Sequence, residues 1–311
     1  MTTAAPLRPE LRRLAVPLYL PWGMAALGAG VILPVLPVYL EESGLRLSVV
    51  GLITAAAGLG SALGGVPASS LAERRGTDRL LVVALLVAAG TAAALGSTDV
   101  AVLLVGLQMV NGLAFAGIQQ SRQLVVARTT EVRLRGRVNS FVGGQHRLMF
   151  IIGPLLGGFV FDRYGAQAAF GLAGAVTAAG LAFTVLPGGR DGTPIAPPDE
   201  RVRVVPSLWR HRSRLARAGL GPLLIMAARR GRYVVVPLIG DELALSGAAI
   251  GALVAVGTTA DFLLFPVSGY VMDRWGRLLS MVPAFSLMAV GLLLLGFADT
   301  VTQAVVAGVV M

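Results

Sequence analysis

The chain carries nine apolar runs, each long enough to form a helix that crosses a lipid bilayer. About 20 apolar residues span the hydrocarbon core as a helix. The runs cover residues 14–40, 46–71, 80–97, 100–121, 138–161, 165–186, 218–240, 246–271 and 278–297, and a tenth begins near Thr300. Backbone groups in lipid must be paired within helices or closed barrels, and the alternating pattern of barrel strands is missing. We therefore expect an all-α polytopic membrane protein.

The distribution of basic residues predicts the orientation in the membrane. All 26 basic residues are Arg, and the net charge is +10. If the N-terminus is inside, the inner loops contain 19 of these residues and the outer loops contain only Arg46 and Arg163. This asymmetry follows the positive-inside rule, so the basic charge reflects topology and gives no indication of a nucleic-acid partner. The Arg-, Ala- and Gly-rich composition is typical of a GC-rich bacterial genome. We expect a multi-pass protein of the cell (plasma or inner) membrane with a cytoplasmic N-terminus.

Several kinds of site are excluded by the residues that the sequence lacks. There is no Cys, which excludes disulfides, thiolate metal sites and Cys nucleophiles. The two His residues, His146 and His211, are too few for most metal sites, so we expect no metal and no cofactor. The run 14–40 is longer than the apolar region of a cleaved signal peptide, which is about 7–15 residues, so we interpret it as the first span.

One long polar segment divides the chain. Residues 187–217 follow six expected spans and are rich in Pro, Gly and Arg, as a linker between two halves would be. We expect an N-terminal six-helix half at 1–186, a cytoplasmic linker at 187–217, and a partial C-terminal half with helices 7–10 at 218–311. The section Ser207–Arg217 is either a short amphipathic helix on the inner leaflet or a solvated part of the linker.

The two halves are related by an internal repeat. Shifting the chain by 200 residues aligns Pro37 with Pro237, Glu42 with Glu242 and Gly51 with Gly251, without gaps. Such duplication is typical of transporters with a site between two halves. At this offset Met311 corresponds to Asn111, within the fourth span of the first half. The repeat therefore predicts a second half that is truncated in its fourth helix, with about 9–10 of 12 helices present.

Two loops at the same offset carry a family motif. The loop after the eighth span reads GYVMDRWGR and its counterpart in the first half reads SSLAERRGT. The first matches the pattern GxxxDRxGR, and the second is a degenerate copy. The motif residues are Gly269, Asp273, Arg274, Gly276 and Arg277, together with Glu73, Arg74 and Gly76. Glycine permits a tight turn, and the carboxylate can cap a neighbouring helix. The chain thereby resembles the major facilitator superfamily (MFS) over its whole length. The resemblance implies two pseudo-symmetric six-helix halves and a loop clasp that holds them together in one gating state.

The fifth span resembles that of one branch of the superfamily. It contains the segment GPLLGG with Gly153, Pro154, Gly157 and Gly158, which is similar to the fifth-helix motif of proton-coupled drug antiporters. The resemblance implies efflux. In the fourth span, however, the Arg that is tied to proton coupling in that branch is replaced by Gln108.

Ionisable side chains in the middle of spans are the candidates for coupling. Such residues are costly in lipid and are therefore functional candidates. The eighth span contains Asp261, and the fifth contains His146 and Arg147. Because the fifth and eighth helices are neighbours in the family fold, we expect Asp261 to pair with Arg147 or His146, either as the proton-coupling site or as a structural ion pair.

The seventh span contains a cluster of Arg residues. Arg229 and Arg232 lie one turn apart on one face, whereas Arg230 points elsewhere. We expect Gly231 to interrupt the helix and leave cationic side chains around a cavity that binds an anionic group. The alternatives are side chains that extend towards the interface and a span that is shifted by several residues.

A polar stripe on the fourth span is the candidate substrate site. Steps of three and four residues place its members on one face: Gln108, Asn111, Phe115, Gln119 and Arg122. On the fifth span, Asn139, His146 and Phe150 also share a face. We expect the two stripes to line a substrate cavity. The alternative for the fourth span is hydrogen bonding between helices.

These observations together predict a secondary transporter. The leading hypothesis is proton-coupled efflux of a small organic solute or drug by alternating access. The alternative is an MFS symporter or uniporter for a small metabolite, for which the midspan Arg residues indicate an anion. An enzyme is not expected, because no GxSxG motif is present. The expected partners are the lipid bilayer, a small-molecule substrate and protons, and we expect a monomer.

Overall fold

The computed structural model describes residues 19–130, 132–185 and 210–311, and within these ranges the chain is helical with no strand. The helices are α2 (Leu20–Glu42), α3 (Leu47–Arg75), α4 (Thr77–Ala94), η2 (Leu95–Ser97), α5 (Ala101–Thr129), α6 (Val132–Val185), α8 (Arg212–Glu242), α9 (Gly247–Trp275), α10 (Arg277–Leu295) and α11 (Val301–Val310). The expected all-α architecture is confirmed. The first expected span began at residue 14, and 14–18 lie outside the described residues.

The fifth and sixth expected spans form the single element α6. The element turns sharply at Gly165, whose φ of 80° and ψ of 175° are not helical. A positive φ is readily adopted by glycine, which has no Cβ. The two spans therefore meet directly at Gly165, with no further loop between them.

Seven of the described helical segments are long and apolar enough to cross a membrane. Helix α8, which contains the seventh expected span, is not among them, because its Arg residues lower its hydropathy. It begins at Arg212, inside the segment expected to be linker, and its first turns are continuous with the span. The rest of the expected linker, 187–209, lies outside the described residues.

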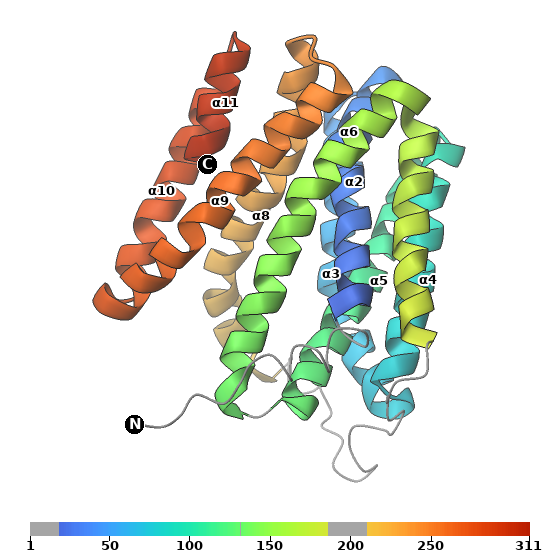
Figure 1. Ribbon diagram of the computed structural model, residues 1–311, viewed down its shortest axis with the longest axis vertical. Coiled ribbons are helices and arrows are strands. Elements are labelled where there is room, and N and C mark those ends of the chain that lie inside the picture. Colours follow the sequence, from blue (N-terminus) through green and yellow to red (C-terminus); the bar gives the residue numbers. More distant parts are fainter. Residues whose placement is uncertain (1–18, 131, 186–209) are drawn as a thin grey trace.

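The helices form two groups, α2–α6 and α8–α11 (Figure 1). We call α2–α6 the N-unit and α8–α11 the C-unit. Helix α9 begins and ends 200 residues after α3, at Gly247–Trp275 and Leu47–Arg75. The connecting turns repeat as well. Gly76 and Gly276 have φ of 87° and 89°, and Gly44 and Ala244 have φ of 78° and 54°. The repeat expected from the sequence is therefore present in the backbone.

The turns define the two ends of the molecule. We call the end with the turns at Gly76 and Gly276 the motif face, because it carries the loop motifs. The other end, with the turns at Gly44, Gly165 and Ala244, is the far face. In Figure 1 the α8–α9 connection and the bend of α6 lie together at the far face.

Small residues allow the helices of the N-unit to pack at backbone distance. A Cβ atom added to Gly60 of α3 would lie 2.0 Å from the carbonyl oxygen of Met109 in α5. A Cβ on Gly112 of α5 would be equally close to the carbonyl oxygen of Ala57. Such interfaces are typical of membrane helices, which associate by close packing rather than by burial from water.

Candidate functional site

The fifth-helix motif packs against both units. A Cβ on Gly157 would lie 2.2 Å from the carbonyl oxygen of Val31 in α2, within the N-unit. On the other side, a Cβ on Gly158 would lie 2.0 Å from the carbonyl oxygen of Gly247 in α9. Pro154, one turn before Gly158, makes a similar contact: a Cβ on Gly251 of α9 would lie 2.2 Å from its carbonyl oxygen. The motif thus brings the backbones of the N-unit and the C-unit into contact near the far face.

A carboxylate joins the two units at the same place. Asp162, one turn beyond the fifth-helix motif, accepts hydrogen bonds from the backbone N–H groups of Gly247 (2.5 Å) and Ala248 (2.7 Å). These are the first two residues of α9. The first N–H groups of a helix have no partner inside the helix and attract negative charge. Asp162 of the N-unit therefore caps a helix of the C-unit.

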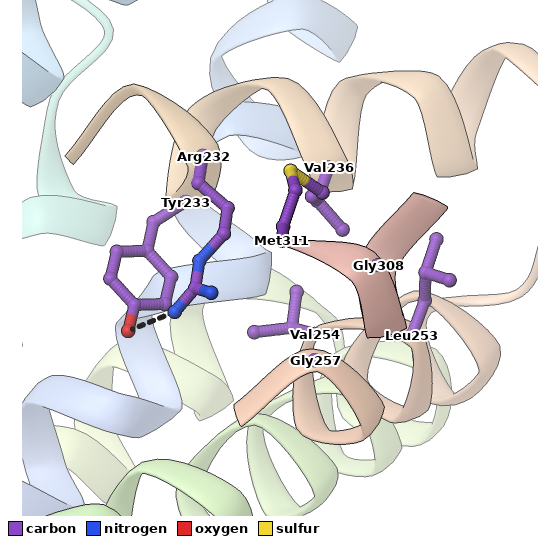
Figure 2. A pocket seen from close by; sticks show the side chains of 8 residues that line it. All are labelled: Arg232, Tyr233, Val236, Leu253, Val254, Gly257, Gly308 and Met311. Atoms are coloured by element: carbon purple, nitrogen blue, oxygen red, sulfur yellow. Dashed lines mark hydrogen bonds between the residues drawn. The ribbon is translucent and has the colours of Figure 1, made fainter. Parts of the chain in front are cut away.

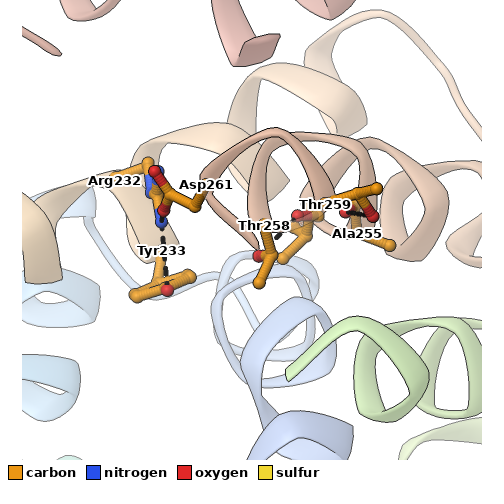
Figure 3. A network of polar contacts seen from close by, with 7 residues as sticks. Arg232, Tyr233, Ala255, Thr258, Thr259 and Asp261 are labelled. Atoms are coloured by element: carbon orange, nitrogen blue, oxygen red, sulfur yellow. Dashed lines mark hydrogen bonds and ion pairs between the residues drawn. The ribbon is translucent and has the colours of Figure 1, made fainter. Parts of the chain in front are cut away.

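The acid of the eighth span pairs with the seventh. Figure 3 shows Asp261 of α9 facing Arg232 of α8, with the carboxylate oxygen 2.9 Å from the guanidinium nitrogen. The same guanidinium donates to the hydroxyl of Tyr233 at 3.1 Å. The expected partners of Asp261, Arg147 and His146, were therefore wrong. Arg232 lies on the helix next to α9 in the same unit and is nearer to the carboxylate.

The rest of the Arg cluster is less buried than Arg232, which is 6% exposed. Arg229 is half-buried, Arg230 is exposed, and neither forms an ion pair within the described ranges. Helix α8 continues through Gly231 without a break, so the interruption expected there was wrong. The Arg side chains of this cluster therefore project from a continuous helix and do not surround a gap in it.

His146 and Arg147 of α6 make aromatic contacts instead. The ring of His146 lies between those of Trp22 and Phe150, at centroid distances of 4.9 and 4.3 Å. Phe150 in turn faces Tyr233 of the C-unit at 6.2 Å. The His146 Nδ1 atom is buried and has no hydrogen-bond partner in the described part of the chain. The row of rings thus runs from the N-unit to the polar network of α8.

Arg147 also reaches across the boundary between the units. Its guanidinium carbon lies 3.8 Å from the ring centroid of Phe265 in α9, a cation–π distance. It therefore contacts the eighth helix as expected, although through an aromatic ring rather than through Asp261.

The polar stripe of the fourth span, in α5, is divided between two roles. Near the motif face, the Oε1 atom of Gln119 accepts from Trp22 (3.2 Å) and Arg122 (3.1 Å), and Arg122 lies over the Trp22 ring. Farther along, the amide of Asn111 donates to the Thr91 hydroxyl of α4 at 2.8 Å. The interhelical alternative therefore describes both Asn111 and Gln119, which bond α4 and α2, whereas Arg122 lies over the Trp22 ring.

The other members of the expected cavity lie apart. Gln108 is buried, Phe115 packs against the hydrophobic core of the N-unit, and Asn139 is exposed. A small pocket with a cavity volume of about 10 Å³ lies elsewhere, between α8, α9 and α11 (Figure 2). Its lining residues are Arg232, Tyr233, Val236, Leu253, Val254, Gly257, Gly308 and Met311. Of the residues expected to line a substrate cavity, Arg232 is among those that line this pocket. The polar side chains of the pocket, Arg232 and Tyr233, therefore belong to the network around Asp261. The described residues contain no group of three His, Asp or Glu side chains that could hold a metal ion.

The loop motifs form matching turns at the motif face. Gly76 and Gly276 each provide the positive φ between two helices, whereas Gly269 lies inside α9. Glu73 and Arg74 precede Gly76 in the last turn of α3. Arg274 donates to the Tyr270 hydroxyl at 2.8 Å and lies over the ring of Trp275. The side chains of Asp273 and Arg277 lie outside the described part of the structure.

Sequence reasoning missed three residues of these contacts. Asp162, Trp22 and Tyr233 were not among the residues that the sequence singled out. The position of Asp162, just after a Gly-rich motif and just before the turn glycine, was the available signal. Nothing in the sequence indicated that the Arg122 guanidinium lies over the Trp22 ring.

The two related groups of membrane-length helices define a polytopic membrane protein built from an internal repeat. The family model of the Major Facilitator Superfamily matches residues 23–311, and the chain belongs to this superfamily.

Individual relatives are distant. Multidrug resistance protein 2 of Bacillus subtilis (strain 168) is 27% identical over 154 residues, which are 49% of this chain and 38% of that protein. The solved nucleoside transporter NupG has a TM-score of 0.67 at 14% identity, over 96% of this chain and 78% of that one. A bacterial homologue of the lysosomal transporter Spinster, in an inward-facing and unoccupied conformation, has a TM-score of 0.67 at 16% identity, over 99% and 72%. These structures share the fold.

Proposed function

We propose that the chain moves a small organic solute across the membrane by alternating access and exports it in exchange for protons. The observation that carries this proposal is the ion pair between Arg232 of α8 and Asp261 of α9, which lies beside a small pocket. The fifth-helix motif and the similarity to a multidrug resistance protein support export. A transport function requires no cofactor, and we propose no enzymatic activity.

The ion pair offers a physical route for coupling. An Arg side chain within a membrane helix needs a counter-charge, because an unpaired charge is costly there. Protonation of Asp261 removes the charge that Arg232 faces. Arg232 then keeps its bond to the Tyr233 hydroxyl, and we propose that a polar or anionic group of the solute replaces the carboxylate. Because the Tyr233 ring packs on Phe150 of the N-unit, a shift of Arg232 is passed to the contact between the units.

The orientation follows from the charges of the loops. We propose that the motif face and the N-terminus lie in the cytoplasm, that the far face lies outside, and that the chain is a monomer in a bacterial cell membrane. Arg74, Arg75 and Arg79 surround the turn at Gly76, which agrees with the positive-inside rule.

The first test is proton exchange in inside-out vesicles with an acidified lumen. A panel of fluorescent organic cations, zwitterions and anions is added, and lumen pH is recorded together with uptake of each dye. For a transported dye we expect uptake with loss of the acidic lumen, and Asp261→Asn is expected to abolish both. Uptake without proton movement, or with proton entry into the lumen, contradicts antiport.

Two further variants separate coupling from structure. Asp261→Asn alone leaves Arg232 unpaired and is expected to destabilise the protein by about 3–5 kcal/mol. The double variant Asp261→Asn with Arg232→Gln removes both charges, so it is expected to fold but not to couple. Thr259→Val is the matched control, because among the described residues the Thr259 hydroxyl bonds its own helix, at the Ala255 carbonyl. If the double variant still exchanges protons, the ion pair is structural.

A second candidate function is suggested by the excess of positive charge. Arg122, Arg147 and Arg229 have no carboxylate partner among the described residues. A symporter or uniporter for an organic anion would use such groups to bind its substrate. In the same assay, this alternative predicts uptake of the anionic dyes alone, with no loss of the acidic lumen.

A further inference from the structure

We infer that Asp162 is a latch that holds the N-unit and the C-unit together at the far face. This inference rests on the proposed alternating access, because a latch has a function only if the units separate there during transport. The observation is the pair of hydrogen bonds from Gly247 and Ala248 to one carboxylate of the other unit.

The bonds are well suited to this role. Each of the two carboxylate oxygens accepts from one backbone N–H, at 2.5 and 2.7 Å. Charge-assisted bonds of this kind are stronger than bonds between neutral groups. The cap of the C-unit itself, Ser246, accepts from the next N–H along, that of Ala249. Asp162 therefore binds donors that the C-unit leaves without a side-chain partner.

A helix at this place in the repeat can form without a capping carboxylate. Helix α3, the counterpart of α9 in the repeat, begins after Arg46 with no side-chain cap. Its first turn is nevertheless helical, with Val50 bonded to the Arg46 carbonyl. The contact of Asp162 with α9 is therefore an addition to the fold, placed where two units meet.

The position of Asp162 makes its bonds sensitive to opening. The residue lies in α6, between the fifth-helix motif and the turn at Gly165. Its backbone therefore moves with the N-unit, because the motif packs against α2 at Val31. Its partners belong to α9 of the C-unit. A rigid-body separation of the units at the far face lengthens both bonds at once and also parts Gly158 from Gly247. The Asp162 hydrogen bonds and the Gly158–Gly247 contact therefore hold the same two helices, α6 and α9, together at the far face.

The absence of Cys in the sequence allows a direct distance measurement. Spin labels at Ser48→Cys and Phe297→Cys report the separation of the units at the far face. Labels at Arg79→Cys and Leu279→Cys report the motif face. All four positions are exposed. The distances are measured by pulsed electron paramagnetic resonance on the full chain in lipid nanodiscs.

The latch predicts opposite changes at the two faces. In Asp162→Asn, which loses the charge and one acceptor, a longer far-face distance and a shorter motif-face distance should become populated. Asp162→Glu keeps the carboxylate and should retain most of the short far-face population. Asp99→Asn is the matched control, because Asp99 lies at the same face but bonds Tyr39 within the N-unit. Ser246→Ala removes the cap inside the C-unit and should leave both distances unchanged.

The outcomes are distinguishable from a failure of the transport proposal, because the distances require no solute. Unchanged distances in Asp162→Asn overturn the latch, even if the protein transports. An equal shift in the Asp99→Asn control also overturns it. If Asp162→Asn does not fold, Asp162→Ser provides the same test, because its shorter side chain cannot reach both N–H groups. A far-face shift without detectable transport supports the latch and leaves the transported solute unidentified.

Discussion

Ala244 occupies a backbone conformation that suits glycine better. Its φ is 54°, and the equivalent residue of the first unit is Gly44, with a φ of 78°. A left-handed conformation brings Cβ close to the following carbonyl oxygen, which costs about 1–2 kcal/mol for residues other than glycine. The repeat therefore keeps the turn geometry in both units but has the unfavourable residue in one of them.

Ala244→Gly is therefore expected to stabilise the protein. Removal of the Cβ should raise the free energy of unfolding by about 1 kcal/mol, less the greater chain entropy of glycine in the unfolded state. Thermal unfolding in detergent measures the change. Gly44→Ala is the reciprocal variant and should lower the midpoint. If Ala244→Gly also lowers it, the proposed strain is not present.

At the scale of single side chains, the sequence predicted positions better than partners. The stripe on α5 was expected to line one cavity, but Asn111 bonds Thr91 of α4, whereas Arg122 lies over Trp22. Periodicity gives the direction of a side chain relative to its own helix. It contains no information about which helix lies opposite, so the partner of Asp261 was also missed.

At the scale of elements, the fifth-helix motif is expected to respond strongly to added volume. In Gly158→Ala the new methyl group meets the Gly247 carbonyl, so the units must move apart at the far face. Overpacking of this kind costs about 1–3 kcal/mol. We expect a longer far-face distance between the Ser48 and Phe297 labels. Gly171→Ala, on the same element with nothing within 4 Å, is the control and should show no shift.

The elements themselves were largely predictable. Hydrophobic length located most of the described helices, because lipid requires an apolar span of about 20 residues. The repeat located the matching turns, because Gly76 and Gly276 sit at the same place in both units. The contact of Gly158 with Gly247 was not predictable, since it depends on how two units approach each other. Helix α8 was least well predicted, because its Arg residues made Gly231 look like a break.

At the scale of the whole molecule, charge and contact divide the two faces. The far face brings the units together through Asp162 and through the backbone contact of Gly158. The motif face carries the Arg residues beside the turns at Gly76 and Gly276. Because positively charged loops remain in the cytoplasm, the described contacts close the side that we propose to face outward.

This orientation predicts which side of the membrane each face contacts. In intact cells, a membrane-impermeant thiol reagent should label Phe297→Cys, at the far face, and should not label Arg79→Cys, at the motif face. Both side chains are exposed, and the chain has no other Cys to react. Permeabilised cells are the control, in which both variants should react. The reverse pattern in intact cells would place the motif face outside. In that orientation the far face, with Asp162, would lie in the cytoplasm. Proton exchange at Asp261 would then accompany import of the solute instead of export.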